Sequence, residues 1–137
     1  MTDLITWAPR MSVGVAILDE DHKRIMAMIN KLHDAMVIGH AKDILGEIFH
    51  DLMVYINLHF ETEEAMFDQT GYQGGDEQKK LHKEFAAKTL SIKQQFKENP
   101  QSVQPMEILY FLKDWWLDHI MNTDKKYASF LNAHGIH

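Results

Sequence analysis

Histidine side chains interrupt the apolar faces of the helical segments that the sequence predicts. His22 lies three residues before Ile25 on one such face, and His59 lies three residues after Ile56 on another. Spacings of three and four residues place side chains on the same face of a helix. A single histidine on an apolar face is more often a hydrogen-bonded core residue than a ligand, so the pattern across several helices matters more than any one member.

Two further segments and two acidic residues extend the pattern. Glu63 lies one turn after the histidine of the second segment, and Gln78 and His82 are one turn apart on the third. His119 lies on the fourth apolar face, and Asp124 follows five residues later. Burying a carboxylate is costly unless it is paired with a cation or bound to a metal. Because Lys and Arg are missing from these faces, the acids indicate a metal centre in the interior.

The ligand types narrow the choice of metal. Imidazole and carboxylate ligands without thiolate suit iron, manganese or zinc. Four histidines and two acids exceed the four ligands of a tetrahedral zinc site. Since carboxylates can bridge two ions, the set favours a pair of metals over a single one.

The spacing between His119 and Asp124 does not fit an ideal helix. Five residues leave the two side chains about 140° out of alignment at 3.6 residues per turn. Either a wide turn such as a π-bulge re-aims Asp124 into the interior, or Asp124 is not a ligand. The spacing leaves both alternatives open.

Other polar residues are expected to lie outside the site. Glu64 is about 100° around the helix from Glu63, so we expect its loss to matter little. The remaining five histidines are expected at the surface or in the core away from the centre, with one of them in a loop at position 40; they are His33, His40, His50, His134 and His137.

Four helical patterns must position the candidate ligands. They run from about 18 to 38, 42 to 67, 76 to 98 and 105 to 131, and TGYQGG after the second is the strongest helix breaker in the chain. The predicted fold is all-α: an antiparallel up-down-up-down four-helix bundle over about residues 18–131. We expect an extended arm over about residues 1–17, and a single domain spanning residues 1–137.

Composition and charge exclude several classes of protein. The chain has 137 residues and a formal net charge of −6, which disfavours a nucleic-acid partner and an anionic membrane surface. It has no cysteine, which excludes disulfides, thiolate metal sites and thiol catalysis. The sequence shows neither a signal pattern nor an apolar run of membrane-spanning length. We therefore expect a monomeric, cytoplasmic protein without a membrane partner.

Four short segments resemble the signature segments of the hemerythrins, in particular the single-domain bacterial hemerythrins: DEDHKRI, HFETEEAMF, QKKLHKEF and HIMNTD. The signature is a lone His, then His-xxx-Glu, then His-xxx-His, then His-xxxx-Asp, and the resemblance covers nearly the whole chain. Hemerythrins are four-helix bundles that enclose a non-haem di-iron centre and bind dioxygen reversibly. The resemblance implies the same fold and activity here, with two oxo- or hydroxo-bridged iron ions as the cofactor.

The resemblance also assigns roles to individual residues. It implies that His22 and His59 hold one iron, and that Glu63 and Asp124 bridge the two irons. A bridging role for Asp124 favours the alternative in which a wide turn re-aims this side chain.

The second iron is where the sequence departs from the family. The resemblance implies that His82 and His119 hold this iron, but the third ligand falls on Gln78, where the family has a histidine. A glutamine can ligate only weakly, through its amide oxygen. If Gln78 does not ligate, both irons have an open or water-filled position.

Trp116 is a second departure. Three residues before the last ligand histidine, the family commonly places a leucine against the oxygen-binding pocket. A tryptophan at this position could narrow the pocket, supply an indole N–H group, or turn away from the pocket, and the sequence does not choose among these.

The function favoured by the sequence is an oxygen-binding di-iron protein: a carrier, store or sensor with dioxygen as its ligand and an unidentified reductant or protein partner. Two alternatives remain. One is a di-metal enzyme (an oxidase, a peroxidase or a nitric-oxide-handling protein) that the altered ligand set at Gln78 enables. The other is a metal-binding or structural bundle without oxygen chemistry.

Overall fold

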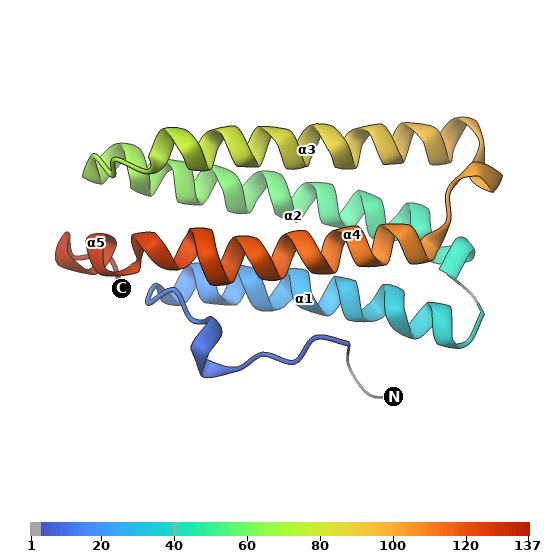
Figure 1. Cartoon of the computed structure of the whole chain (residues 1–137), viewed down its shortest axis with the longest axis horizontal. Helices are drawn as coiled ribbons and strands as arrows, with labels where there is room; N and C mark the ends of the chain where they lie inside the picture. The colour runs from blue at the N-terminus through green and yellow to red at the C-terminus, as the bar shows by residue number, and fades with distance from the viewer. Residues whose placement is uncertain (1–3, 40) are drawn as a thin grey trace.

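Four long helices run alongside one another in an antiparallel up-down-up-down bundle (Figure 1). They are α1 (Ala16–Val37), α2 (Ala41–Thr70), α3 (Gly75–Glu98) and α4 (Pro105–Asp118). The structure, a computed structural model, describes residues 4–39 and 41–137, without the side chains of residues 41–44 and 49. The predicted all-α bundle is confirmed. Of the sequence predictions, the start of the arm at residues 1–3 and the loop position of His40 fall outside the described residues.

The fourth helical segment is interrupted. The sequence predicts that it continues in some form to about residue 131, and in the structure the regular helix α4 ends at Asp118. A π-helical turn (His119–Thr123), a 3₁₀ turn (Asp124–Tyr127) and the short helix α5 (Ala128–Ala133) follow. In the π-turn, the backbone N–H of Asp124 donates to the carbonyl of His119, which widens the helix by one residue per turn. This is the wide turn of the first alternative that the five-residue spacing left open.

Polar residues divide the apolar core into two clusters. On α1, His22 lies between Leu18 of the smaller cluster and Ile25 of the larger one. On α2, Glu63 precedes Phe67 of the smaller cluster by one turn. The smaller cluster consists of Val13, Val15, Leu18, Phe67, Tyr127 and Leu131. The polar layer is therefore sealed by apolar side chains on both sides along the bundle axis.

The turn between α2 and α3 sets the relative position of these two helices. Gly71 has a φ of +71°, a left-handed conformation that glycine adopts without steric cost. The backbone N–H groups of Gly71 and Tyr72 both donate to the carbonyl of Phe67, at 2.8 and 3.1 Å, and so close the end of α2. A Cβ on Gly75 would lie 3.2 Å from the Cβ of Phe67, so the small residue permits the close approach of α3.

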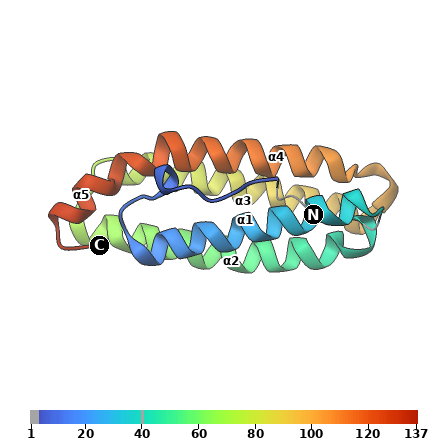
Figure 2. The same ribbon diagram turned by 90° about the horizontal axis from the view of Figure 1, so that it is seen from below.

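The N-terminal arm runs along the bundle beside α1 and α4 and contains a 3₁₀ turn, Pro9–Met11 (Figure 2). Asn30 holds the arm at Ile5: the Asn30 side chain accepts from the backbone N–H of Ile5 at 2.9 Å and donates to the Ile5 carbonyl at 2.8 Å. The Asp19 carboxylate fixes its end, because it accepts from the Ser12 hydroxyl and the Val13 N–H. The arm thus covers one side of the bundle.

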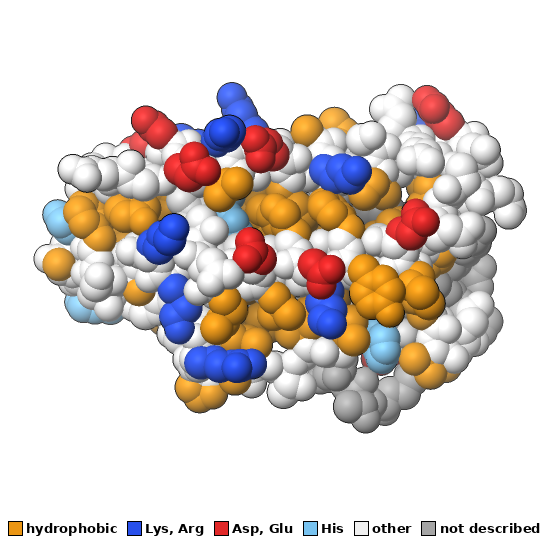
Figure 3. All heavy atoms as spheres, in the orientation of Figure 1, with side chains coloured by type: hydrophobic (Ala, Val, Ile, Leu, Met, Phe, Trp, Pro, Cys, Tyr) orange, Lys and Arg blue, Asp and Glu red, His pale blue; other side chains and the backbone are white. Residues whose placement is uncertain are grey.

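The surface shows mixed charge. On the face drawn in Figure 3, Lys and Arg side chains alternate with Asp and Glu, and apolar side chains are exposed between them. Within the described part of the chain, none of the helices combines the length and the apolar character needed to cross a bilayer.

Candidate metal centre

The seven polar residues singled out from the sequence lie together in the interior, and none is more than 3% exposed. They are His22, His59, Glu63, Gln78, His82, His119 and Asp124. They lie near the starts of α1 and α3 and near or just beyond the ends of α2 and α4, the ends that an antiparallel bundle brings to one level. Among the described residues, the buried polar side chains include no Lys or Arg. The two carboxylates therefore face imidazoles and no permanent cation.

The ligand atoms of six of them, all but Gln78, form two groups, and in each group the atoms lie within 4.8 Å of one another. We call the first group the first position; it consists of His22, His59, Glu63 and Asp124. The second position consists of Glu63, His82 and His119. Glu63 belongs to both groups, so the protein offers two adjacent cation positions that share a carboxylate.

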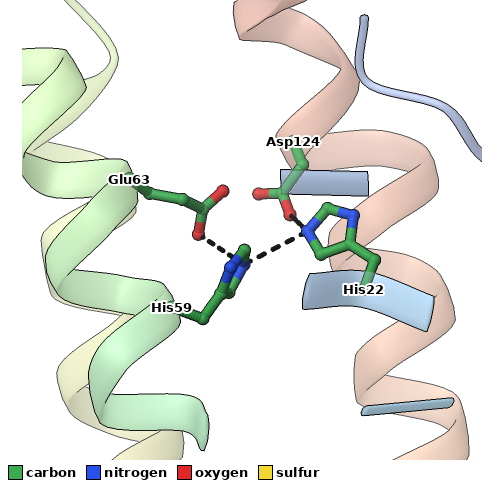
Figure 4. A group of neighbouring side chains, drawn as sticks. All are labelled: His22, His59, Glu63 and Asp124. Carbon is green, nitrogen blue, oxygen red and sulfur yellow. Dashed lines mark hydrogen bonds and ion pairs between the residues drawn. The ribbon is translucent and has the colours of Figure 1, made fainter. Parts of the chain in front are cut away.

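The first position is compact (Figure 4). The Nε2 atoms of His22 and His59 are 3.1 Å apart. His59 Nε2 lies 3.0 Å from Oε1 of Glu63, and His22 Nε2 lies 3.3 Å from Oδ2 of Asp124. These side chains come from α1, α2 and the turn after α4, and all of them point toward one centre.

The second position lies on the other side of the same carboxylates. His82 Nε2 is 3.3 Å from Oε1 of Glu63, and His119 Nε2 is 2.9 Å from Oδ1 of Asp124. The amide nitrogen of Gln78 donates to Oδ1 of Asp124 at 3.0 Å. Each carboxylate therefore contacts imidazoles of both positions, which is the arrangement that bridging ligands require.

Asp124 owes its place to the π-turn. With ordinary helical geometry it would point about 140° away from His119. The turn instead brings it within 3.3 Å of both His119 and His22, fully buried. The structure thus excludes an outward-facing Asp124, while its role as a ligand stays a prediction.

Two carboxylates outside the centre orient its histidines. Asp21 Oδ2 is 3.0 Å from Nδ1 of His59, and Glu64 Oε2 is 2.9 Å from Nδ1 of His82. A carboxylate on Nδ1 fixes the tautomer that leaves Nε2 free to bind a metal. This contact argues against the expectation that the loss of Glu64 matters little. The helical angle of Glu64 correctly placed it outside the centre. The angle could not show that Nδ1 of His82, the ring nitrogen that faces away from the centre, lies within reach of Glu64.

Tyr127 is another residue that the sequence did not single out. Its hydroxyl donates to Oε2 of Glu63 at 2.6 Å, and the side chain is fully buried. Tyr127 follows Asp124 by three residues, so the π-turn that positions one also positions the other. The bond leaves Oε1 of Glu63 to face both metal positions.

Aromatic rings hold the histidines of the second position from behind. Phe60 stacks on His82 with ring centroids 3.7 Å apart, and Trp115 stacks on His119 at 4.3 Å. Such packing restricts the imidazoles to one orientation, as a precise ligand site requires.

Trp116 faces inward beside the first position. It is 1% exposed, and its ring meets that of His22 edge to face, with centroids 5.3 Å apart, and lies 6.1 Å from that of His59. Its indole nitrogen has no hydrogen-bond partner among the described residues. Of the three alternatives at this position, the one in which Trp116 turns away is wrong.

The other histidines lie elsewhere, as expected, except that His40 is outside the described residues. His50, His134 and His137 are exposed, and His33 is partly buried. Nδ1 of His33 lies 3.7 Å from Oδ1 of its neighbour Asp34.

The buried imidazoles and carboxylates of the centre shift one another's pKa values. From the protein groups alone, burial lowers the pKa of His59, but the charge of Glu63 and hydrogen bonds to Asp21 and Glu63 raise it to about 10. Because this value lies above the ordinary 6.5, the His59 proton stabilises the fold fully below about pH 6.5, and that stabilisation is lost as the pH rises through about 10. Burial raises the pKa of Glu63, yet His59 and His82 hold it well below its ordinary value. A metal ion that binds here must displace protons from imidazole.

Unpaired polar atoms show that the site suits a cation. Nε2 of His82 and of His119, Oε1 of Glu63 and Oδ2 of Asp124 are buried without a hydrogen-bond partner among the described residues. Buried polar atoms are rarely left unpaired. All four converge on the two positions, and all are donors that iron, manganese or zinc accept. A pair of such ions fits the residues present.

A four-helix bundle that brings imidazoles from α1, α2, α3 and the turn after α4 together with two buried carboxylates is a metal-binding bundle. The chain belongs to the hemerythrin family: residues 13–131 match the Hemerythrin HHE cation binding domain. It is similar to bacteriohemerythrins of Pseudomonas aeruginosa (31% identical over 124 residues, 90% of this chain and 79% of the relative) and of Methylococcus capsulatus (30% over 131 residues, 95% and 98%). The resemblance found in the signature segments is thereby confirmed.

Solved structures agree with the fold. A crystal structure of wild-type hemerythrin matches with a TM-score of 0.84 at 29% identity, over 93% of this chain and 98% of that one. A crystal structure of a hemerythrin mutant matches with a TM-score of 0.86 at 28% identity, over 95% and 98%.

The carboxylate on His82 leads to a prediction. Glu64→Ala removes the group that fixes the His82 tautomer, and we expect metal affinity at the second position to fall about 10- to 100-fold. Glu61→Ala is the matched control, because Glu61 lies three residues earlier on the same helix and is exposed. Metal content is measured after dialysis against a buffer of fixed free metal concentration. Equal metal content in the two variants would contradict an orienting role for Glu64.

Proposed function

We propose that this protein binds dioxygen reversibly at a carboxylate-bridged pair of iron ions, and so acts as an oxygen carrier, store or sensor. The observation that carries the proposal is the pair of adjacent cation positions that share Glu63 inside a closed bundle. Membership of the hemerythrin family supports it.

The proposed ligands follow from the contacts. His22 and His59 would hold one iron, and His82 and His119 the other. Glu63 and Asp124 would bridge them, because each carboxylate contacts imidazoles of both positions. Gln78 would ligate the second iron weakly through Oε1, which has no hydrogen-bond partner among the described residues.

When bound, the two irons would supply the electrons for reversible dioxygen binding. The contribution of the protein is to fix and shield them. Asp21, Glu64 and Tyr127 hold the ligands in orientation through bonds of 2.6 to 3.0 Å. The two apolar clusters on either side of the polar layer limit the access of water, which would otherwise compete with a small ligand.

Trp116 shapes the space beside the first position. Its indole ring fills the volume against His22 and His59, and its buried N–H has no partner among the described residues. We infer that it restricts the size of any ligand that reaches the first position.

The proposal is tested by iron analysis joined to an absorption spectrum. Protein reconstituted with ferrous iron is expected to contain two irons per chain and to develop a visible band with dioxygen that disappears on deoxygenation. Glu63→Ala, which removes the shared carboxylate, is expected to retain one iron or none and to lose the band. Two irons without any oxygen-dependent band would contradict oxygen binding.

The same experiment separates the alternative functions. Sustained turnover of hydrogen peroxide or dioxygen without a stable oxygenated spectrum would favour a di-metal enzyme. Tight metal binding with neither an oxygen-dependent band nor turnover would favour a metal-binding or structural bundle without oxygen chemistry.

Trp116→Leu tests the inferred size limit. The smaller side chain should admit azide to the loaded centre faster than in the wild type, at a cost of about 2–3 kcal/mol in the free energy of unfolding. Trp7→Leu, on the arm, is the matched control and should leave the azide rate unchanged. Azide binding is followed by stopped-flow absorption, and unchanged rates in both variants would show that Trp116 does not limit access.

A further inference from the structure

Gln78 brings a neutral amide into the centre, and a hydrogen bond to Asp124 holds this amide at its nitrogen. It lies one turn before His82 on α3 and is 2% exposed. Its amide nitrogen donates to Oδ1 of Asp124 at 3.0 Å and lies 3.5 Å from the carbonyl of Thr123. Its amide oxygen is buried without a partner among the described residues.

The orientation of this amide is fixed by chemistry. A carboxylate only accepts hydrogen bonds, so the amide nitrogen must face Asp124. The opposite orientation would place two oxygens against each other in a buried site. Oε1 is therefore the one atom that Gln78 can offer to a metal, and a neutral amide oxygen is a weaker donor to iron or zinc than an imidazole nitrogen.

The bond from Gln78 also makes the two oxygens of Asp124 unequal. Oδ1, on the side of the second position, already accepts a hydrogen bond. Oδ2, on the side of the first position, has no hydrogen-bond partner in the described part of the chain and lies 3.3 Å from His22 Nε2. Asp124 therefore offers its less committed oxygen to the first position.

The donor sets of the two positions are unequal as a result. The first position has two imidazoles, the shared Glu63 oxygen and the free oxygen of Asp124. The second has two imidazoles, the same Glu63 oxygen, a carboxylate oxygen already used by Gln78, and one weak amide oxygen. Both positions are equally buried, so the difference lies in the donors.

We propose that the centre loads its two metals unequally: the first position holds a resident ion, and the second takes an ion that exchanges, with Gln78 as the residue that sets the difference. This inference rests on the two-metal centre proposed above. When metal is limiting, the one-metal form predominates, and a second, different metal can then enter the other position.

The test adds cobalt(II) in steps to metal-free protein without oxygen, and follows heat by calorimetry and visible absorption. For the wild type we expect two separate steps, with dissociation constants about 10- to 100-fold apart. A mild chelator should then remove one equivalent quickly and the other slowly. The fast-exchanging ion should be the one whose absorption changes in Glu64→Ala, because Glu64 contacts only the second position.

Variants of Gln78 test whether this residue causes the difference between the two binding steps. Gln78→His supplies a nitrogen donor one turn from His82, so its two steps should converge and its fast-exchanging equivalent should disappear. Gln78→Leu removes both ends of the amide, so it should keep the first step and weaken the second further. Gln94→His places an imidazole on the exposed side of the same helix and should behave as the wild type does.

The outcomes separate this inference from the function on which it rests. Two equivalent cobalt steps in the wild type, or identical behaviour of Gln78→His and the wild type, would overturn unequal loading while leaving the two-metal centre intact. No cobalt binding by wild-type protein would overturn the two-metal centre itself. Circular dichroism verifies that each variant is folded, and the wild-type titration decides the question even if a variant is not.

Discussion

Two carboxylates, Glu63 and Asp124, lie fully buried in the bundle, and no Lys or Arg is among the buried residues that the structure describes. Such groups are tolerated only where positive charge compensates them. Imidazoles surround both, and each carboxylate contacts histidines on two sides. Protons on the histidines can provide part of the compensation, as the raised pKa of His59 indicates. Metal ions bound between the same atoms would provide it more completely, and they would connect side chains of α1, α2, α3 and the turn after α4.

The rest of the structure serves to bring these groups to one level and to keep water away. Antiparallel packing places the starts of α1 and α3 beside the ends of α2 and α4. The glycine turn at Gly71 sets α2 against α3, and the π-turn rotates Asp124 inward. The arm, held at Ile5 by Asn30, covers one side of the bundle. Because the candidate ligands come from separate helices, we expect metal binding to be coupled to the folding of the bundle.

The sequence predicted the features that follow from helical periodicity. His22, His59 and His82 each lie on an apolar stripe, so their convergence could be predicted from spacing alone. The orienting contacts could not, because they depend on side-chain reach: Glu64 is on the wrong face for the centre, yet it contacts the far nitrogen of His82. Tertiary packing also decides the rotamer of Trp116 and the hydrogen bond of Tyr127, and neither has a local signature. The π-turn was indicated only indirectly, since no local composition identifies a π-turn and the five-residue spacing alone suggested one.

Anomalous X-ray scattering from crystals grown with excess ferrous iron tests most directly whether metal ions compensate the buried carboxylates. Data collected above and below the iron edge should show two peaks in each molecule. One should lie among His22, His59, Glu63 and Asp124, and the other among Glu63, His82 and His119, with both carboxylates in contact with both ions. A centre without iron, in which Glu63 and Asp124 instead accept hydrogen bonds from protonated histidines, would contradict the central claim.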